Sequence, residues 1–91
     1  MKPAASRHFK QLQLLSANIK RLRAEQNLTQ MELAEKADVE LQYLQKLEYG
    51  QRNPSIAIVW SIAKAFNVKI DDLFQEVPLV KQKRGRPRKS G

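Results

Sequence analysis

The fold of this chain is decided by two stretches, LTQMELAEKA at residues 28–37 and LEYGQRNPS at residues 47–55. In the first, Thr29 and Glu32 have the S/T-x-x-E spacing of a capping box, a specific signal that a helix begins directly after the threonine. In the second, Gly50 stands where a glycine in a left-handed conformation typically ends a helix. One helix is therefore predicted to begin after Thr29, and another to end just before Gly50.

These two helices are predicted at residues 30–37 and about 40–49, with a tight break at Asp38 and Val39 between them. They span about 20 residues and are joined by a turn of about three or four, which are the dimensions of a helix-turn-helix. In such a unit the first helix crosses the DNA backbone, and the second presents its outer face to the major groove. The spacing therefore indicates a DNA-binding module.

Three further helices are predicted around this pair. Apolar residues that recur with spacings of 3, 3, 4 and 3 indicate one side of a helix at about residues 7–26: Phe9, Leu12, Leu15, Ile19 and Leu22. Ser55 is expected to cap a fourth helix, whose predicted core face comprises Ile56, Val59, Trp60, Ala63 and Phe66. A short fifth helix is expected at about residues 70–75.

The predicted organisation is an all-α, five-helix domain at residues 7–75. A disordered N-terminus at residues 1–6 precedes it, and an extended linker with a basic tail at residues 76–91 follows. The tail is expected to be disordered because it is polar and strongly charged. Asn27 and Asn67 are expected to end their helices in left-handed conformations, which asparagine tolerates better than most residues.

The composition excludes several classes of protein. The 91 residues make one small domain, with little room for a buried active site, and no catalytic residue or enzymatic activity is expected. The chain has no cysteine and one histidine, so neither a metal nor another cofactor is expected. The longest apolar run, residues 56–60, is too short to span a membrane. We expect a cytoplasmic, nucleoid-associated binding protein.

The net charge of +8 indicates a nucleic-acid partner, but it is distributed unevenly. Residues 1–26 carry a net +5, residues 27–80 a net −3 and residues 81–91 a net +6. The segment with most of the apolar residues is therefore mildly acidic. Electrostatic attraction to phosphate is expected to come mainly from the two ends of the chain.

The motifs T-Q-x-x-L-A at residues 29–34 and L-E-x-G-x-R-x-P at residues 47–54 resemble the lambda-repressor-like (XRE-type) helix-turn-helix family. The resemblance continues through IAKAFNV at residues 62–68 and DLF at residues 72–74, and covers most of the predicted domain. It implies a sequence-specific DNA-binding transcriptional regulator whose partner is double-stranded DNA.

The same resemblance implies roles for individual residues. Gln30 is implied to donate to a DNA phosphate, and Arg23 and Glu48 to form a buried ion pair that does not touch DNA. The resemblance also implies DNA contacts by three groups of residues: base-reading positions on the third helix, residues beside those positions, and residues of the following loop that lie against the DNA sugar-phosphate backbone. They are Leu41, Gln42 and Lys46 for bases, Glu40 and Gln45 beside them, and Arg52 and Asn53 for the backbone.

Side-chain chemistry suggests what the third helix recognises. Gln42 can form two hydrogen bonds with adenine, one through its amide N–H and one through its amide oxygen. Lys46 can donate to guanine, and Leu41 can pack on a thymine methyl. Glu40 departs from the Ser or Thr that is usual in the family, and phosphate repels its carboxylate unless a cytosine amino group donates to it. The alternative is that this helix is only structural or faces a protein.

The segment KRGRPRK at residues 83–89 resembles an AT-hook. Glycine lets the backbone approach the floor of a narrow minor groove, proline keeps the chain extended, and the arginines lie along the groove where A·T tracts are most negative. The alternative is a basic tail that binds phosphate without preference or only improves solubility. The residues are Lys83, Arg84, Gly85, Arg86, Pro87, Arg88 and Lys89.

A homodimer is predicted, because paired copies match palindromic half-sites on DNA. The expected interface comprises Ile58, Leu73, Phe74, Val77 and Leu79. Two other functions stay open at this point. One is an antitoxin-like or adapter module that holds a regulatory protein partner, and the other is an architectural protein that prefers A·T-rich DNA.

Overall fold

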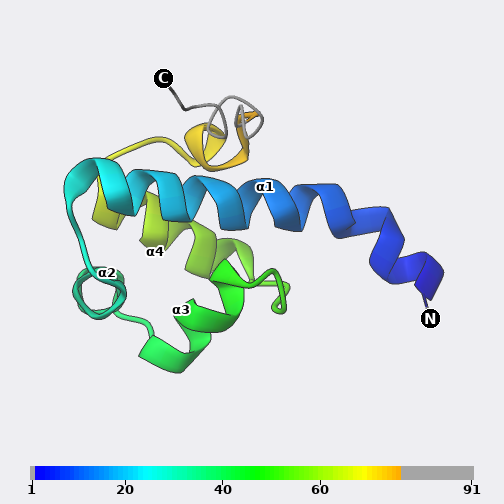
Figure 1. Ribbon diagram of the computed structural model, residues 1–91, viewed down its shortest axis with the longest axis horizontal. Helices are drawn as coiled ribbons and strands as arrows, with labels where there is room; N and C mark the ends of the chain where they lie inside the picture. The colour runs from blue at the N-terminus through cyan, green and yellow to red at the C-terminus, as the bar shows by residue number, and fades with distance from the viewer. Residues whose placement is uncertain (1, 77–91) are drawn as a thin grey trace, which may run out of the picture.

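Residues 2–76 form four α-helices and one short 3-10 helix, which follow one another in sequence (Figure 1). They are α1 (Lys2–Gln26), α2 (Gln30–Ala37), α3 (Leu41–Glu48), α4 (Ile56–Phe66) and the 3-10 helix η1 (Ile70–Phe74). The computed structural model describes the backbone of residues 2–76 and the side chains of residues 9–76. Within that part no strand occurs, so the predicted all-α class is confirmed. The predicted tail at residues 81–91 lies outside the described residues.

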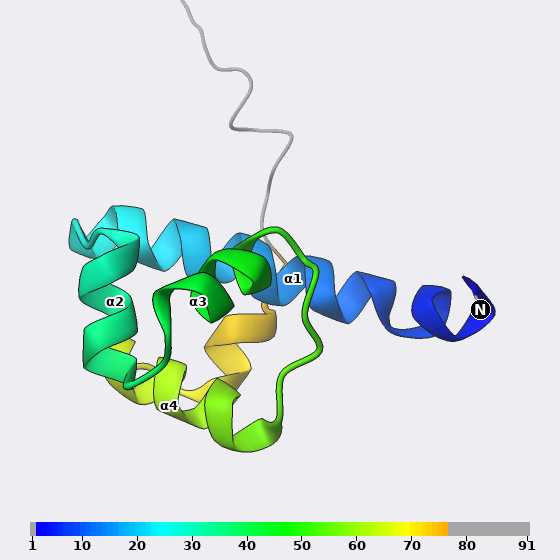
Figure 2. The ribbon, with the colours of Figure 1, turned by 90° about the horizontal axis from the view of Figure 1, so that it is seen from below.

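The helices are arranged around α1, which lies along the longest dimension of the molecule (Figure 1). The N-terminal turns of α1 extend past the other helices in both ribbon views (Figure 2). α2 and α3 lie together on one side of α1, and η1 packs against both α1 and α4. This arrangement leaves the α2–α3 pair at one surface of the molecule.

The predicted helix ends are confirmed. Thr29 caps α2 with a complete capping box, in which its hydroxyl accepts from the Glu32 main-chain N–H at 3.0 Å and the Glu32 carboxylate accepts from the Thr29 N–H at 2.9 Å. Asn27, Gly50 and Asn67 all have positive φ, at 58°, 74° and 62°. These residues end their helices because asparagine and glycine adopt this conformation at low cost.

One helix boundary and one helix type differ from the simplest form of the predictions. α1 begins at Lys2 rather than near residue 7, so residues 2–6 are helical. Pro3 falls in the first turn, where its missing N–H would have no helical partner, and the two alanines after it favour extension of the helix. The fifth helix is a 3-10 helix rather than an α-helix, which is common for a segment of only five residues.

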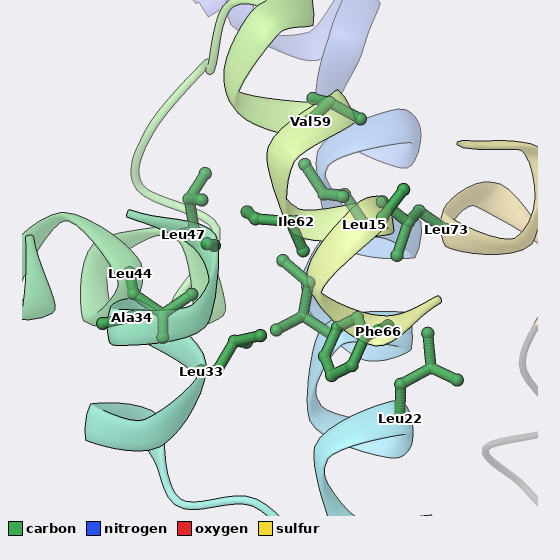
Figure 3. Packing of buried hydrophobic residues seen from close by; sticks show 13 residues of the cluster. Leu15, Leu22, Leu33, Ala34, Leu44, Leu47, Val59, Ile62, Phe66 and Leu73 are labelled. Atoms are coloured by element: carbon green, nitrogen blue, oxygen red, sulfur yellow. The ribbon is translucent and has the colours of Figure 1, made fainter. Parts of the chain in front are cut away.

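The hydrophobic core lies between α1, α2, α3, α4 and η1. Figure 3 shows side chains from these elements pointing toward one another around Phe66 of α4. Its members are Leu15, Ile19, Leu22, Leu33, Ala34, Ala37, Leu44, Leu47, Val59, Ile62, Ala63, Phe66 and Leu73.

Three residues predicted for the core are exposed instead. Ile56 and Trp60 of α4 are 70% and 53% exposed, and Phe9 of α1 is 57% exposed. The buried side of α4 follows Val59 and Ile62, and Trp60 lies about 100° around the helix from Val59. Phe9 lies toward the N-terminal end of α1, and more than half of its side chain is exposed.

Asn18 of α1 connects the C-terminal part of the fold to the first helix. Its side chain is fully buried, and Nδ2 lies within hydrogen-bond distance of the Leu73 and Gln75 carbonyl oxygens, at 3.0 and 2.8 Å. Its Oδ1 accepts from the Arg21 guanidinium. Asn18 therefore holds the main chain at residues 73–75 against α1.

No described helix combines the length and apolarity needed to cross a membrane. Among the described residues, no three His, Cys, Asp or Glu side chains come together as metal ligands would.

Candidate nucleic-acid interface

The two sides of α3 differ in burial. Leu44, Leu47 and Glu48 face the interior, whereas Gln42 and Lys46 are exposed. Because two of the expected base-reading side chains project from the outer face, α3 has the polarity that a helix in the major groove needs.

The other expected positions around α3 are less uniform. Leu41 packs partly against the core, so only part of its side chain is available to a thymine methyl. Gln45 is half-buried, and Glu40 is exposed. Glu40 precedes α3 in an extended conformation and its carboxylate makes no capping hydrogen bond, in keeping with its departure from the usual Ser or Thr.

Arg23 and Glu48 form the ion pair that joins α1 to α3. The Arg23 guanidinium donates to both oxygens of the Glu48 carboxylate, from Nε at 2.7 Å and from Nη2 at 3.0 Å. Arg23 also donates to the Leu28 carbonyl oxygen at 2.9 Å, and Ser16 donates to the Glu48 main-chain oxygen at 2.9 Å. The pair fixes the inner side of α3 against α1, which holds its outer side in place.

Gln30, the first residue of α2, points toward α3. Its Nε2 donates to Glu48 Oε1 at 3.0 Å, and its Oε1 accepts from Gln45 Nε2 at 3.3 Å. Both ends of the amide are therefore engaged within the protein. The second N–H of its NH₂ group has no partner among the described residues, so the donation to a DNA phosphate that the resemblance implied stays a prediction.

Arg52 lies in the loop after α3 and was expected to contact the sugar-phosphate backbone of DNA. Its guanidinium carbon is 4.5 Å from the centroid of the Tyr43 ring on α3, a distance at which the cation and the ring attract each other. Arg52 and its neighbour Asn53 are exposed. The ring therefore holds a cation beside α3 without removing it from solvent.

The expected dimer interface does not form a surface in the described part of the chain. Leu73 is fully buried in the core, so its assignment to an interface is wrong. Ile58 and Phe74 are half-buried against the same core, because the flank of α4 and the end of η1 pack within the monomer. Val77 and Leu79 lie outside the described residues, as does the AT-hook-like segment at residues 83–89.

Sequence reasoning did not single out two of these contacts. Tyr43 received no role, and Gln45 was placed only beside the base-reading positions. Each contact joins residues well separated in the chain, nine for Tyr43 and Arg52 and 15 for Gln45 and Gln30. No local motif indicates such a pairing, because it depends on how the loop and the two helices meet.

Comparison with known proteins identifies the family. The helix-turn-helix family model matches residues 19–73, which include α2, α3, α4 and most of η1. The chain belongs to this helix-turn-helix family.

Among relatives of this helix-turn-helix protein, an uncharacterized HTH-type transcriptional regulator of Archaeoglobus fulgidus is 42% identical over 60 residues, covering 66% of this chain and 84% of its own. The immunity repressor protein of Bacillus phage phi105 is 36% identical over 64 residues, covering 70% of this chain and 44% of its own. The match therefore spans less than half of that repressor.

Solved structures show the same fold. The restriction-modification controller protein C.AhdI from Aeromonas hydrophila has a TM-score of 0.67 and 28% identity, with 69% of this chain and 96% of that chain covered. The clp gene regulator ClgR from Corynebacterium glutamicum has a TM-score of 0.65 and 31% identity, with 68% and 66% covered.

Proposed function

We propose that this helix-turn-helix protein binds duplex DNA in a sequence-specific way and regulates transcription. The observation that carries the proposal is the outer face of α3, where Gln42 and Lys46 are exposed while the opposite side is anchored by buried leucines and the Glu48 ion pair. Relatives named as a transcriptional regulator and as an immunity repressor support the same function. In this proposal α3 enters the major groove, and Gln42 and Lys46 contact base edges.

The proposal extends to the basic tail. The segment at residues 83–89 enters an adjacent A·T-rich minor groove, where Arg84 and Arg86 lie along the groove floor. Its support is chemical: residues 81–91 contain six basic and no acidic residues. A tail tethered to a bound domain has a high effective concentration at the neighbouring groove, so two modest affinities reinforce each other.

We further propose that the protein acts as a homodimer. The support is an exposed apolar pair on α4, Ile56 and Trp60, which lie one helical turn apart on the same side. A second copy is the occupant that suits this face, because a two-fold dimer presents two α3 helices to a palindromic site.

Selection of bound sites from a pool of random duplexes tests the DNA-binding proposal. The wild-type chain is expected to enrich a defined motif, and Lys46→Ala is expected to weaken enrichment at one base pair. Lys69→Ala is the matched control. It removes the same charge next to η1, an element on the opposite side of α1 from α2 and α3 (Figure 1). Failure of the wild-type chain to enrich any motif would contradict the proposal.

A further inference from the structure

The charged carboxylate of Glu48 determines how the Gln30 amide is oriented. A carboxylate is only an acceptor, so Gln30 must turn its NH₂ group toward Glu48. Its oxygen then faces Gln45, whose NH₂ group donates to it at 3.3 Å. A single chain of hydrogen bonds thus leads from the ion pair on α1 and α3, through α2, to a second side chain on α3.

These hydrogen bonds determine which groups of the Gln45 amide stay available for a base. One of its two amide N–H groups is engaged by Gln30, while its oxygen accepts no hydrogen bond from any described residue. One N–H and one oxygen match the edge of adenine, which presents the N7 acceptor and the N6 donor in the major groove. Guanine presents two acceptors there and would need both N–H groups.

We propose that Gln30 is a positioning residue that fixes the Gln45 amide for recognition of adenine, rather than a donor to a DNA phosphate. This inference rests on the proposed function, because it requires α3 to lie in the major groove. Gln45 is half-buried and held before DNA arrives, whereas the exposed Gln42 has no side-chain hydrogen bond to a described residue. An ordered side chain loses less conformational entropy on binding, so Gln45 discriminates more sharply than Gln42.

A panel of duplexes tests this role. Its parent is the duplex that the wild-type chain selects from the random pool, and each other member carries one altered base pair. In Gln45→Ala, the preference for adenine over guanine is expected to fall about 5- to 150-fold at one base pair, the range for one bidentate contact. Gln30→Ala is expected to reduce the preference at that same base pair. The double variant is expected to be no worse than Gln45→Ala.

The matched control is Gln42→Ala, which is expected to relax a different base pair and to combine additively with Gln30→Ala. Glu48 keeps both hydrogen bonds from Arg23 in all these variants, so the buried charge stays compensated. Gln30→Met, which keeps the side-chain length without the amide, is expected to reproduce Gln30→Ala.

Two results have separate meanings. A uniform loss of affinity across the panel in Gln30→Ala, with the preferences intact, would make Gln30 a phosphate donor and overturn this inference. A wild-type chain that shows no base preference at all would instead contradict the proposed function.

Discussion

Glu48 is the residue at which α1, α2 and α3 are joined. Its side chain is buried, and its carboxylate accepts hydrogen bonds from both Arg23 and Gln30. A buried carboxylate is tolerated when a cation compensates its charge and donors satisfy its oxygens. Gln30 carries no charge, so the compensation comes from Arg23.

Replacing Arg23 with alanine is expected to lower the free energy of unfolding by about 3 kcal/mol, because Glu48 is left buried without a cation. Urea unfolding followed by circular dichroism measures the change. Glu25→Ala is the control, since it breaks an ion pair with Arg21 at the surface of the same helix and should cost less than about 0.5 kcal/mol. Equal losses of unfolding free energy in the two variants would show that burial does not increase the contribution of the Arg23–Glu48 pair to stability.

Tyr43 is expected to hold Arg52 in place for the DNA backbone. Tyr43→Leu removes the ring from beneath the guanidinium, and the affinity for the selected duplex should fall about 2- to 5-fold, as expected for an exposed cation–π contact. Tyr43→Phe retains the ring and should bind as the wild type does. Fluorescence anisotropy measures these affinities. If Tyr43→Leu weakens binding as much in an Arg52→Ala background, the ring acts on something other than Arg52.

At the scale of elements, the attachment of η1 to α1 depends on Asn18. The asparagine amide donates to the carbonyl oxygen of the buried Leu73, which would otherwise lack a donor, and to that of the exposed Gln75. Asn18→Leu is expected to cost about 2–4 kcal/mol, because two acceptors and the Arg21 contact lose their partner. Hydrogen exchange should show loss of protection in η1 before the other helices.

Gln26→Ala is the matched control for this variant. Gln26 also donates to a main-chain carbonyl, that of Phe66 at 2.9 Å, but it is an exposed residue. Water can replace its donor, so the expected cost is about 1 kcal/mol. A cost for Asn18→Leu as small as that for Gln26→Ala would mean that η1 is held mainly by its apolar contacts.

The predictability of these elements from sequence depends on the range of the contact. Thr29, Gly50 and Asn67 could be identified as helix ends because a cap is decided by residues within one turn. The burial of Leu73 and the exposure of Trp60 could not, because both depend on which flank of α4 meets α1 and η1. The same limit applies to the site: the exposed outer face of α3 followed from its period, but the contact of Gln30 with Gln45 required the relative placement of two helices.

At the scale of the whole molecule, the exposed pair on α4 is the basis of the proposed homodimer. Static light scattering at tens of micromolar should give twice the chain mass of 10.5 kDa. Trp60→Lys is expected to give the monomer mass, because a charge at an apolar interface must be desolvated. Met31→Lys makes a similar change at an exposed site on α2 and should leave the dimer intact. A monomeric wild type would contradict the proposal.

The distribution of charge over the whole chain favours a major role for the tail. Residues 2–76 contain eleven basic and nine acidic residues, a net charge of only +2, so three quarters of the total +8 lies in residues 81–91. Attraction to DNA depends on the number of phosphates that basic residues neutralise, and each neutralised phosphate contributes to the salt dependence of binding. The helical domain by itself therefore has little charge with which to attract DNA.

Deletion of residues 81–91 is expected to weaken binding to the selected duplex and to reduce the slope of log K against log salt by up to about 5, since six basic residues are lost. The matched variant replaces Arg84 and Arg86 with lysine, which preserves the charge but lacks the planar guanidinium. Because arginine is the cation that a narrow A·T groove attracts most effectively, this variant should keep the slope and lose the preference for A·T flanks. Binding titrations of the three chains from 50 to 200 mM salt, on duplexes with A·T or G·C flanks, measure both quantities. An unchanged slope after deletion would contradict any DNA contact by the tail, whereas equal flank preference in the lysine variant and the wild type would reduce the tail to a non-specific polycation.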